Sequence, residues 1–171
     1  MNTQTYYTLM ESPIGSLMLS GGAGGLTGVH VCNQKHAPSI QSDWICDEKP
    51  FHNAIEQLQE YFSGQRTEFD LKLNPVGTDF QKKVWQALCA IPYGKSCGYG
   101  ELATAIGNPK AARAVGMANG QNPLSIIVPC HRVIGANGSL TGYGGGLRAK
   151  EWLLRHELHF AFTGLALTAS R

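Results

Sequence analysis

The chain has few charged residues and no long apolar run. Charged side chains make up 15% of its 171 residues and hydrophobic ones 43%, so it can bury a core and is not a disordered chain. No stretch approaches the roughly 20 apolar residues that a membrane-spanning helix needs. The first basic residue is Lys35, so the N-terminus lacks the charged segment of a secretion signal. We therefore expect a cytoplasmic protein with no membrane partner.

The cysteines follow no pattern of paired or metal-binding thiols. Their number, five, is odd, and no Cys-x-x-Cys pair occurs, which disfavours a disulfide framework and a four-cysteine zinc site. The first part of the chain holds several possible ligands at spacings that match no tight zinc pattern, namely His30, Cys32, His36, Cys46 and His52. We therefore expect no metal and no cofactor. In the cytoplasm the thiols stay reduced, which leaves room for one of them to be a nucleophile.

Charge is unevenly distributed along the chain. Residues 1–75 carry four Lys and Arg against eight Asp and Glu, whereas residues 76–157 carry nine against four. The second part therefore has the sign expected of an anion-binding module, and nucleic acid is a candidate partner. The alternative is that Lys and Arg simply solvate one face of the protein.

The first part of the chain predicts a small sheet and a helix. Short apolar runs between Gly-rich turns indicate an antiparallel meander over 6–10, 17–19 and 26–31, followed by a polar loop over 33–49. Apolar residues at helical spacing predict a helix over 51–62, which Gly64 ends, and alternation over 69–73 predicts a half-buried strand. The break at Asn74–Gly77 divides the chain into domains of residues 1–75 and 76–171.

The second part predicts mainly helices. Thr78 and Gln81 form a capping-box pattern at the start of one helix, and two short helices over 99–106 and 109–119 are joined by a tight turn, as in a helix-turn-helix. Residues 125–128 predict a buried strand, Asn137-Gly138 predicts a hairpin turn, and a last helix spans 147–157. We therefore assign the chain to the α+β class, with a sheet-and-helix domain before a mostly helical one.

The second helix of the helix-turn-helix presents small side chains. It reads Lys110-Ala111-Ala112-Arg113, whereas a helix that reads base edges in the major groove usually offers several long polar side chains. If this helix meets DNA, it fits a reading of shape or of a narrow groove, with Arg113 as the one long probe. The alternative is that the alanines pack against a neighbouring helix and no DNA is bound.

A Cys-His pair follows the apolar run before residue 130. Reactive cysteines need the thiolate form and therefore lie near His, a cation or a helix N-terminus, and the base in turn needs a group that fixes its tautomer. Cys130 and His131 are followed by Arg132, and Glu157 at the end of the last helix is a candidate for the orienting carboxylate. Neighbours on an extended strand point to opposite sides, so a water would link Cys130 to His131. The alternative is a structural cysteine beside an incidental histidine.

These residues and several segments around them resemble one family. Pro129-Cys130-His131-Arg132-Val133 resembles the active-site motif of the O6-alkylguanine-DNA alkyltransferases, which are methylated-DNA–protein-cysteine methyltransferases, here of the bacterial single-protein type. Further similar segments occur in order from about Thr78 to Glu157, namely 108–116, 119–123, 142–147 and 150–154. The first part resembles the family loosely, chiefly at Ser12-Pro13-Ile14-Gly15.

The resemblance implies DNA repair by irreversible, stoichiometric transfer of the alkyl group of O6-methylguanine, and of O4-methylthymine, to Cys130. The protein would be a monomer that binds double-stranded DNA in the minor groove with the alkylated base flipped out. His131 would take the thiol proton through a water, Glu157 would orient His131, Tyr99 would donate to guanine N3, and Asn122 would hold the hinge. The DNA-binding residues would be Lys110, Ala111, Ala112 and Arg113, and the pocket would be lined by Val133, Tyr143, Gly144 and Gly145. The first domain would have a supporting role.

Two other functions compete with suicide transfer. A non-enzymatic protein that binds alkyl lesions would lack the reactive cysteine, and Cys130 argues against it. A hydrolase built on Cys130 and His131 would leave the helix-turn-helix and the basic second part unexplained. Gly144 departs from the family, which often has Ser or Ala there, and this favours tolerance of bulkier alkyl groups. The family's zinc site is not evident, and residues 158–171 have no clear counterpart.

Overall fold

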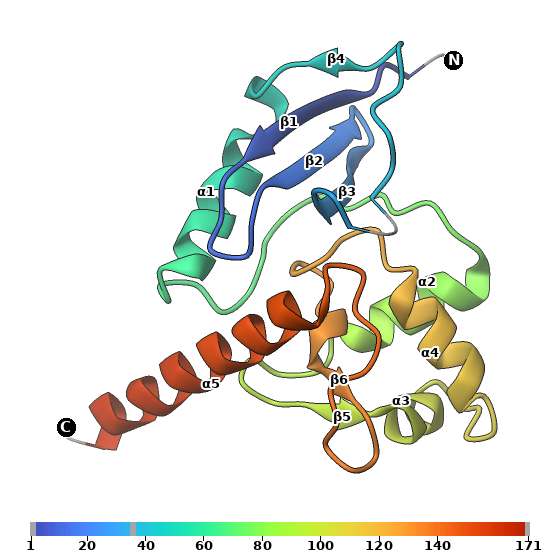
Figure 1. The fold of residues 1–171 in the computed structure, drawn as a ribbon, viewed down its shortest axis with the longest axis vertical. Helices are drawn as coiled ribbons and strands as arrows, with labels where there is room; N and C mark the ends of the chain where they lie inside the picture. Colours follow the sequence, from blue (N-terminus) through green and yellow to red (C-terminus); the bar gives the residue numbers. More distant parts are fainter. Residues whose placement is uncertain (1–2, 35–36, 170–171) are drawn as a thin grey trace.

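The computed structural model describes residues 3–34 and 37–169, and for residues 165–169 it describes the backbone alone. Figure 1 shows an N-terminal part made of a sheet and one helix, and a C-terminal part made mainly of helices, as expected for the α+β class. Within the described residues, no helix combines the length and apolar character needed to cross a membrane.

The N-terminal sheet is the predicted meander with one added edge strand. Strands β1 (Tyr6–Met10), β2 (Leu17–Gly22) and β3 (Gly25–Val31) are antiparallel neighbours. A two-residue strand, β4 (Ile45–Cys46), pairs with β1 in parallel and gives the order β3-β2-β1-β4. The prediction of an unbroken loop over 33–49 is therefore wrong. Both β4 residues are exposed, so β4 has no apolar alternation that could mark it in the sequence.

Helix α1 lies beside the sheet, and the segment after it is irregular. A short 3₁₀ helix, η1 (Lys49–Phe51), leads into α1 (His52–Phe62), whose end at Gly64 has a positive φ of 80°. The predicted strand over 69–73 is wrong, because only one bridge forms there, between Leu26 and Leu73. The apolar alternation nevertheless reports burial correctly, since Phe69, Leu71 and Leu73 are half-buried and the residues between them are exposed.

The C-terminal part contains the expected helix-turn-helix. Helix α2 (Asp79–Leu88) begins with the predicted capping box, in which the Thr78 hydroxyl accepts from Gln81 N at 3.1 Å. Helices α3 (Tyr99–Ala105) and α4 (Ala112–Gly120) follow, and the Trp85 indole of α2 donates to the Ala118 carbonyl of α4. Helix α4 begins at Ala112 rather than at Pro109, because residues 108–111 form a turn in which Ala111 N donates to Asn108 O.

The segment before Cys130 is a buried turn, so the predicted strand over 125–128 is wrong. Ile126 has a positive φ of 75°, which is incompatible with a regular strand, and Val128 N bonds back to Leu124 O. The four residues are buried, which explains why their apolar run resembled a core strand. Cys130 itself opens a 3₁₀ helix, η2 (Cys130–Arg132), and not the extended strand that the sequence suggested.

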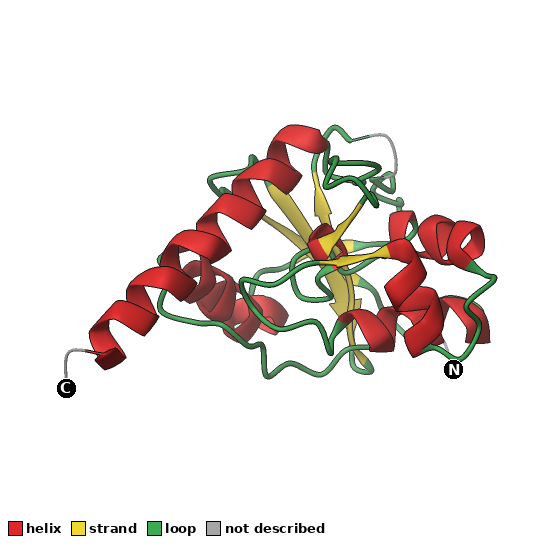
Figure 2. Ribbon diagram, turned by 90° about the horizontal axis from the view of Figure 1, so that it is seen from below, coloured by secondary structure: helices red, strands yellow, loops and turns green. Residues whose placement is uncertain are grey.

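A small second sheet and a long helix complete the fold. Strands β5 (Cys97–Gly98) and β6 (Val133–Ile134) pair in parallel. The predicted hairpin is wrong, since β6 has β5 as its partner, although residues 135–139 do form a tight turn. The last helix, α5 (Leu147–Ala169), is longer than predicted, and Figure 2 shows its C-terminal end extending away from the other elements.

Backbone hydrogen bonds join strand β3 to the segment that precedes Cys130. Val29 N donates to Pro123 O at 2.9 Å, and Ser125 N donates to Val29 O at 3.1 Å. The N-terminal sheet therefore fixes the path of residues 123–125, and through them the position of the Cys130 turn.

We predict that Thr78→Ala lowers the stability of the protein, because it removes the side-chain cap of α2. Loss of such a cap costs about 1 kcal/mol, which corresponds to a fall in Tm of roughly 2–4 °C for a chain of this size. Thr104→Ala is the matched control, since Thr104 is exposed within α3 and its hydroxyl bonds only to Gly100 O. Calorimetry checks both, and an equal change in Tm for the two variants would contradict the capping argument.

Candidate active site

Cys130 is a buried thiol at the start of η2. Only 4% of the residue is exposed, and burial raises the pKa of the thiol to about 11. The Asn122 side-chain amide and the positive charge of Lys150 partly oppose this rise. Since the thiol is protonated at neutral pH, it reacts as a nucleophile only if a base takes its proton.

His131, the residue after Cys130, forms a buried pair with Glu157. His131 Nε2 lies 2.7 Å from Glu157 Oε1, and both side chains are at most 1% exposed. Because a carboxylate can only accept, Nε2 carries the proton in neutral His131, and Nδ1 is left with a free lone pair. Nδ1 is buried and makes no hydrogen bond to a described residue. Nδ1 is therefore the nitrogen of His131 that has a lone pair free to accept a proton.

The Glu157 carboxylate accepts from several segments at once. Arg132 binds it with two hydrogen bonds of 2.9 Å, the Tyr61 hydroxyl donates to Oε1 at 2.7 Å, and Gly94 N donates to Oε2 at 3.3 Å. Bonds from His131 and Arg132 hold the pKa of this carboxyl well below its usual range, against the opposing effect of burial. Glu157 is therefore ionised at neutral pH.

Sequence reasoning gave no role to Tyr61 or Arg132. The sequence did hold a signal for Arg132, because an arginine that follows a buried apolar segment needs an anionic partner. Tyr61 left no such signal, since its helical spacing marks it only as a residue of the apolar face of α1.

Lys150 is a second buried cation that sequence reasoning missed. The residue is fully buried, and its Nζ donates to Val133 O at 2.5 Å and to Thr141 O at 2.7 Å. Burial lowers the pKa of this amine, while the neighbouring Cys130 raises it. Lys150 thus ties the chain after Cys130 to the loop that precedes α5, and its charge favours a thiolate on Cys130.

Two asparagines hold the backbone around Cys130. Asn122 Nδ2 donates to Val128 O at 2.8 Å, and Leu124 N donates to Asn122 Oδ1 at 3.0 Å, so this side chain braces the 122–128 turn. Asn119 Nδ2 lies 3.4 Å from Cys130 O. The Cys130 carbonyl also accepts from Val133 N, and the Val133 carbonyl accepts from Lys150 Nζ.

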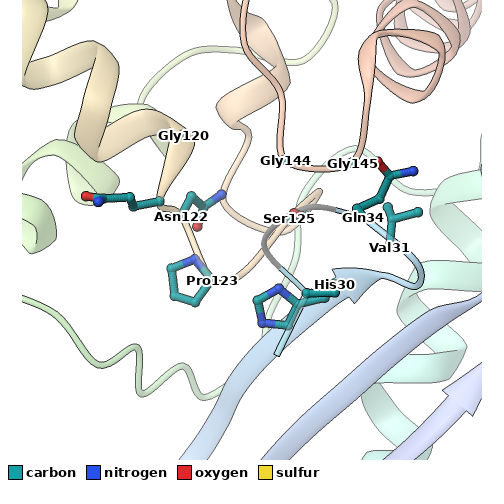
Figure 3. A pocket seen from close by; sticks show the side chains of 11 residues that line it. His30, Val31, Gln34, Gly120, Asn122, Pro123, Ser125, Gly144 and Gly145 are labelled. Atoms are coloured by element: carbon teal, nitrogen blue, oxygen red, sulfur yellow. The ribbon is translucent and has the colours of Figure 1, made fainter. Parts of the chain in front are cut away.

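A pocket of about 80 Å³ lies between β3, the end of α4 and the glycine-rich loop before α5. Figure 3 shows Asn122 and Ser125 beside Gly144 and Gly145, with His30 and Val31 of β3 on the N-terminal side. A Cβ on Gly144 would meet only Gly120 O, at 3.8 Å, whereas one on Gly145 would collide with Tyr143 and Val31. Tyr143 is itself buried and lies near Cys130.

Tyr99 and the residues of α4 lie on another side of the site. The Tyr99 hydroxyl is 3.1 Å from Thr141 Oγ1, and the Tyr99 ring packs on α4 at Gly116. A second pocket, of about 590 Å³, is lined by Tyr99 and Ala112 among others. Lys110 and Arg113 are exposed, whereas Ala111 and Ala112 are half-buried.

The structure thus brings Cys130, His131, Glu157 and Asn122 together at one buried centre, with Tyr143 beside it. Within the described residues, no cluster of three or more His, Cys, Asp or Glu side chains could hold a metal ion. A protonated thiol, a neutral imidazole with a free nitrogen and a fixed carboxylate can together transfer a group to sulfur without a bound metal.

Two family models match the chain in succession. The model described as "6-O-methylguanine DNA methyltransferase, ribonuclease-like domain" matches residues 5–75. The model described as "6-O-methylguanine DNA methyltransferase, DNA binding domain" matches residues 79–159. Together they cover most of the chain, and the second one contains the whole Cys130 centre except Tyr61.

Relatives of known name and structure are similar over nearly the whole length. A methylated-DNA–protein-cysteine methyltransferase of Methanosarcina barkeri is 54% identical over 89% of this chain and 96% of its own, and that of Mycobacterium tuberculosis is 52% identical over 95% and 98%. A crystal structure of the M. tuberculosis O6-methylguanine methyltransferase has a TM-score of 0.85 at 52% identity, covering 91% of this chain and 94% of that one. The same protein in complex with DNA has a TM-score of 0.84 at 51% identity and the same coverage.

We predict that Glu157→Gln destabilises the protein at neutral pH by about 3 kcal/mol or more, because it leaves Arg132 buried without an anion. The wild-type carboxylate has a lowered pKa, so its contribution is complete above the ordinary value of 4.5 and is lost as the pH falls toward the folded value. The difference between the two proteins should therefore shrink below pH 4.5.

Urea unfolding at several pH values measures this difference. Glu151→Gln is the control, since Glu151 is about half exposed and pairs only with the exposed Arg155. A stability gap for Glu157→Gln that stays constant from neutral to acid pH would contradict the ionised state assigned to Glu157.

Proposed function

The chain belongs to the 6-O-methylguanine DNA methyltransferase family, and from this membership we propose that it repairs DNA by moving the alkyl group of O6-methylguanine to its own Cys130. The transfer is irreversible and stoichiometric, because a thioether is a stable product and nothing regenerates the thiol. The observation that carries the proposal is the buried thiol beside a His131–Glu157 pair whose Nδ1 is free to act as a base. O4-methylthymine presents the same kind of methyl carbon and is a second substrate.

The chemical step is an in-line displacement at the methyl carbon. His131 Nδ1 takes the thiol proton through a bridging water, and the sulfur then forms a bond to carbon while the carbon–O6 bond breaks. The electron pair of that bond passes to guanine, which takes a proton from the Tyr99 hydroxyl and leaves neutral, and the thiol proton held by His131 then returns to Tyr99 through solvent. Lys150 favours the thiolate by its charge, and Glu157 stabilises the imidazolium that forms on His131.

Other residues hold the base and assist its departure. Tyr99 donates to guanine N3, and the carbonyls of Cys130 and Val133 are the acceptors for the guanine amino group. Asn122 braces the turn that carries Cys130. Gly144 and Gly145 line the pocket, Tyr143 closes the site beside Cys130, and the missing side chain at Gly144 favours alkyl groups larger than methyl.

The DNA-binding surface is the helix-turn-helix formed by α3 and α4 within the domain of residues 76–171. The small residues Ala111 and Ala112 let α4 approach the minor groove closely, and Lys110 contacts phosphate. The alkylated nucleotide is flipped out of the duplex, and the exposed Arg113 enters the space that it leaves. The protein acts in the cytoplasm as a monomer, with residues 1–75 as a separate supporting domain.

We predict that the protein gains one methyl group when it is incubated with a duplex that carries a single O6-methylguanine. Intact mass and peptide mapping should place that methyl on Cys130, with no more than one per molecule. Cys130→Ala should bind the lesion duplex and gain no methyl, whereas Cys89→Ala, which changes an exposed thiol, should react like the wild type. Tight, lesion-selective binding by the wild type without any transfer would instead indicate a lesion-binding protein.

We predict that Arg113→Ala slows methyl transfer from duplex DNA by roughly 10- to 100-fold, since the flipped base costs a few kcal/mol of unstacking that Arg113 offsets. Transfer from free O6-methylguanine needs no flipping and should keep its rate. The matched control is Arg155→Ala, which changes an exposed arginine on α5. Single-turnover kinetics on both substrates measure the effect, and equal slowing on both would argue against a role in flipping.

A further inference from the structure

A side chain of the N-terminal part of the molecule contacts the buried carboxylate of Glu157. Tyr61 belongs to α1, yet its hydroxyl donates to Glu157 Oε1 at 2.7 Å, the same oxygen that binds His131 Nε2. Both Tyr61 and Glu157 are at most 1% exposed. This contact joins residues 96 positions apart in the chain, and the site described above gives the hydroxyl no task.

Tyr61 is held against α5 by a second bond. His156 Nε2 lies 2.7 Å from the Tyr61 carbonyl, so consecutive residues of α5 bind the backbone and the side chain of one tyrosine. The Tyr61 ring also packs against Phe69, Tyr93 and His156, with ring centroids 5.3–6.1 Å apart. The hydroxyl therefore has a fixed position relative to the carboxylate.

We propose, on the basis of the function proposed above, that Tyr61 is a positioning residue for alkyl transfer. Its hydroxyl occupies an acceptor position on Glu157 Oε1 and thereby limits how tightly that oxygen binds protonated His131, so that Nδ1 stays free to act as a base to a lower pH. The N-terminal part then contributes to the chemistry as well as to the fold.

The negative charge of Glu157 Oε1 is shared among several hydrogen-bond donors. Oε1 accepts from Tyr61, from His131 and from Arg132 Nη2, whereas Oε2 accepts from Arg132 Nε and Gly94 N. Each hydrogen bond that Oε1 accepts reduces the negative charge that this oxygen can offer to the imidazolium. Without the Tyr61 hydroxyl, Oε1 would stabilise the protonated imidazole more strongly, and His131 would hold its proton to a higher pH.

Other ionisable groups also face the pair and must stay unchanged in a test. They are Arg132 and Cys130 on η2, Lys150 on α5, Tyr93 after α2, and Tyr143 in the loop before α5. Tyr93 supplies the matched control, because its ring packs on Tyr61 while its buried hydroxyl bonds to no described residue. Both Tyr61→Phe and Tyr93→Phe keep a ring and remove one buried hydroxyl.

The experiment measures the titration midpoint of His131 in the wild type and in both variants. NMR of the ¹⁵N-labelled imidazole gives this midpoint without any reaction, and single-turnover methyl transfer from an O6-methylguanine duplex gives the acid limb of the rate profile. For Tyr61→Phe we expect both to move to higher pH by roughly half a pH unit, with up to about threefold slower transfer near the midpoint. For Tyr93→Phe we expect no movement.

Each result decides the proposal. An unchanged midpoint in Tyr61→Phe, or equal movement in both variants, would overturn it. So would loss of the folded state in Tyr61→Phe alone, since the hydroxyl would then be structural. If the wild type transfers no methyl, the proposed function fails by itself, while the NMR comparison still shows whether Tyr61 acts on His131 through Glu157.

Discussion

The buried carboxylate of Glu157 is the interaction on which the rest of the structure depends. It accepts hydrogen bonds from Tyr61 on α1, Gly94 after α2, and His131 and Arg132 on η2, and it is itself carried by α5. A buried anion is tolerated only when such donors surround it, so each of these segments has to be in place for the others to be stable. The same requirement leaves Nδ1 of His131 unprotonated, so the proposed role of this nitrogen as a base depends on the way the fold satisfies one charge.

Local sequence patterns predicted the secondary-structure elements that are determined by residues close together in the chain. The three strands of the meander, the apolar face of α1 and the Thr78 cap of α2 each depend on neighbours within a few residues, and all three are present. The strands expected over 69–73 and 125–128 are absent, although the burial that suggested them is real. Apolar runs indicate which side chains are buried. Whether their backbone forms a strand depends on whether a neighbouring strand has a free edge to pair with.

The residues of the candidate site likewise fall into a group that the sequence predicted and a group that it did not. Cys130, His131 and Glu157 were predicted together, because a motif and a chemical requirement converge on them, and the structure places them at one centre. Lys150 and Tyr61 were not predicted. One is a lysine among other basic residues and the other an aromatic on an apolar helix face, and their buried polar contacts arise only when distant segments pack together. Their contribution is therefore a property of the tertiary structure.

Helix α5 carries two of the buried charges of the centre on a single rigid element. Lys150 and Glu157 are seven residues apart, which is close to two helical turns and about 10 Å along the axis, so both point to the same face. An insertion or deletion of one residue between them would rotate one charge by about 100° relative to the other and remove it from the site. The spacing of these two residues should therefore tolerate no change in length, even where the side chains between them are free to vary.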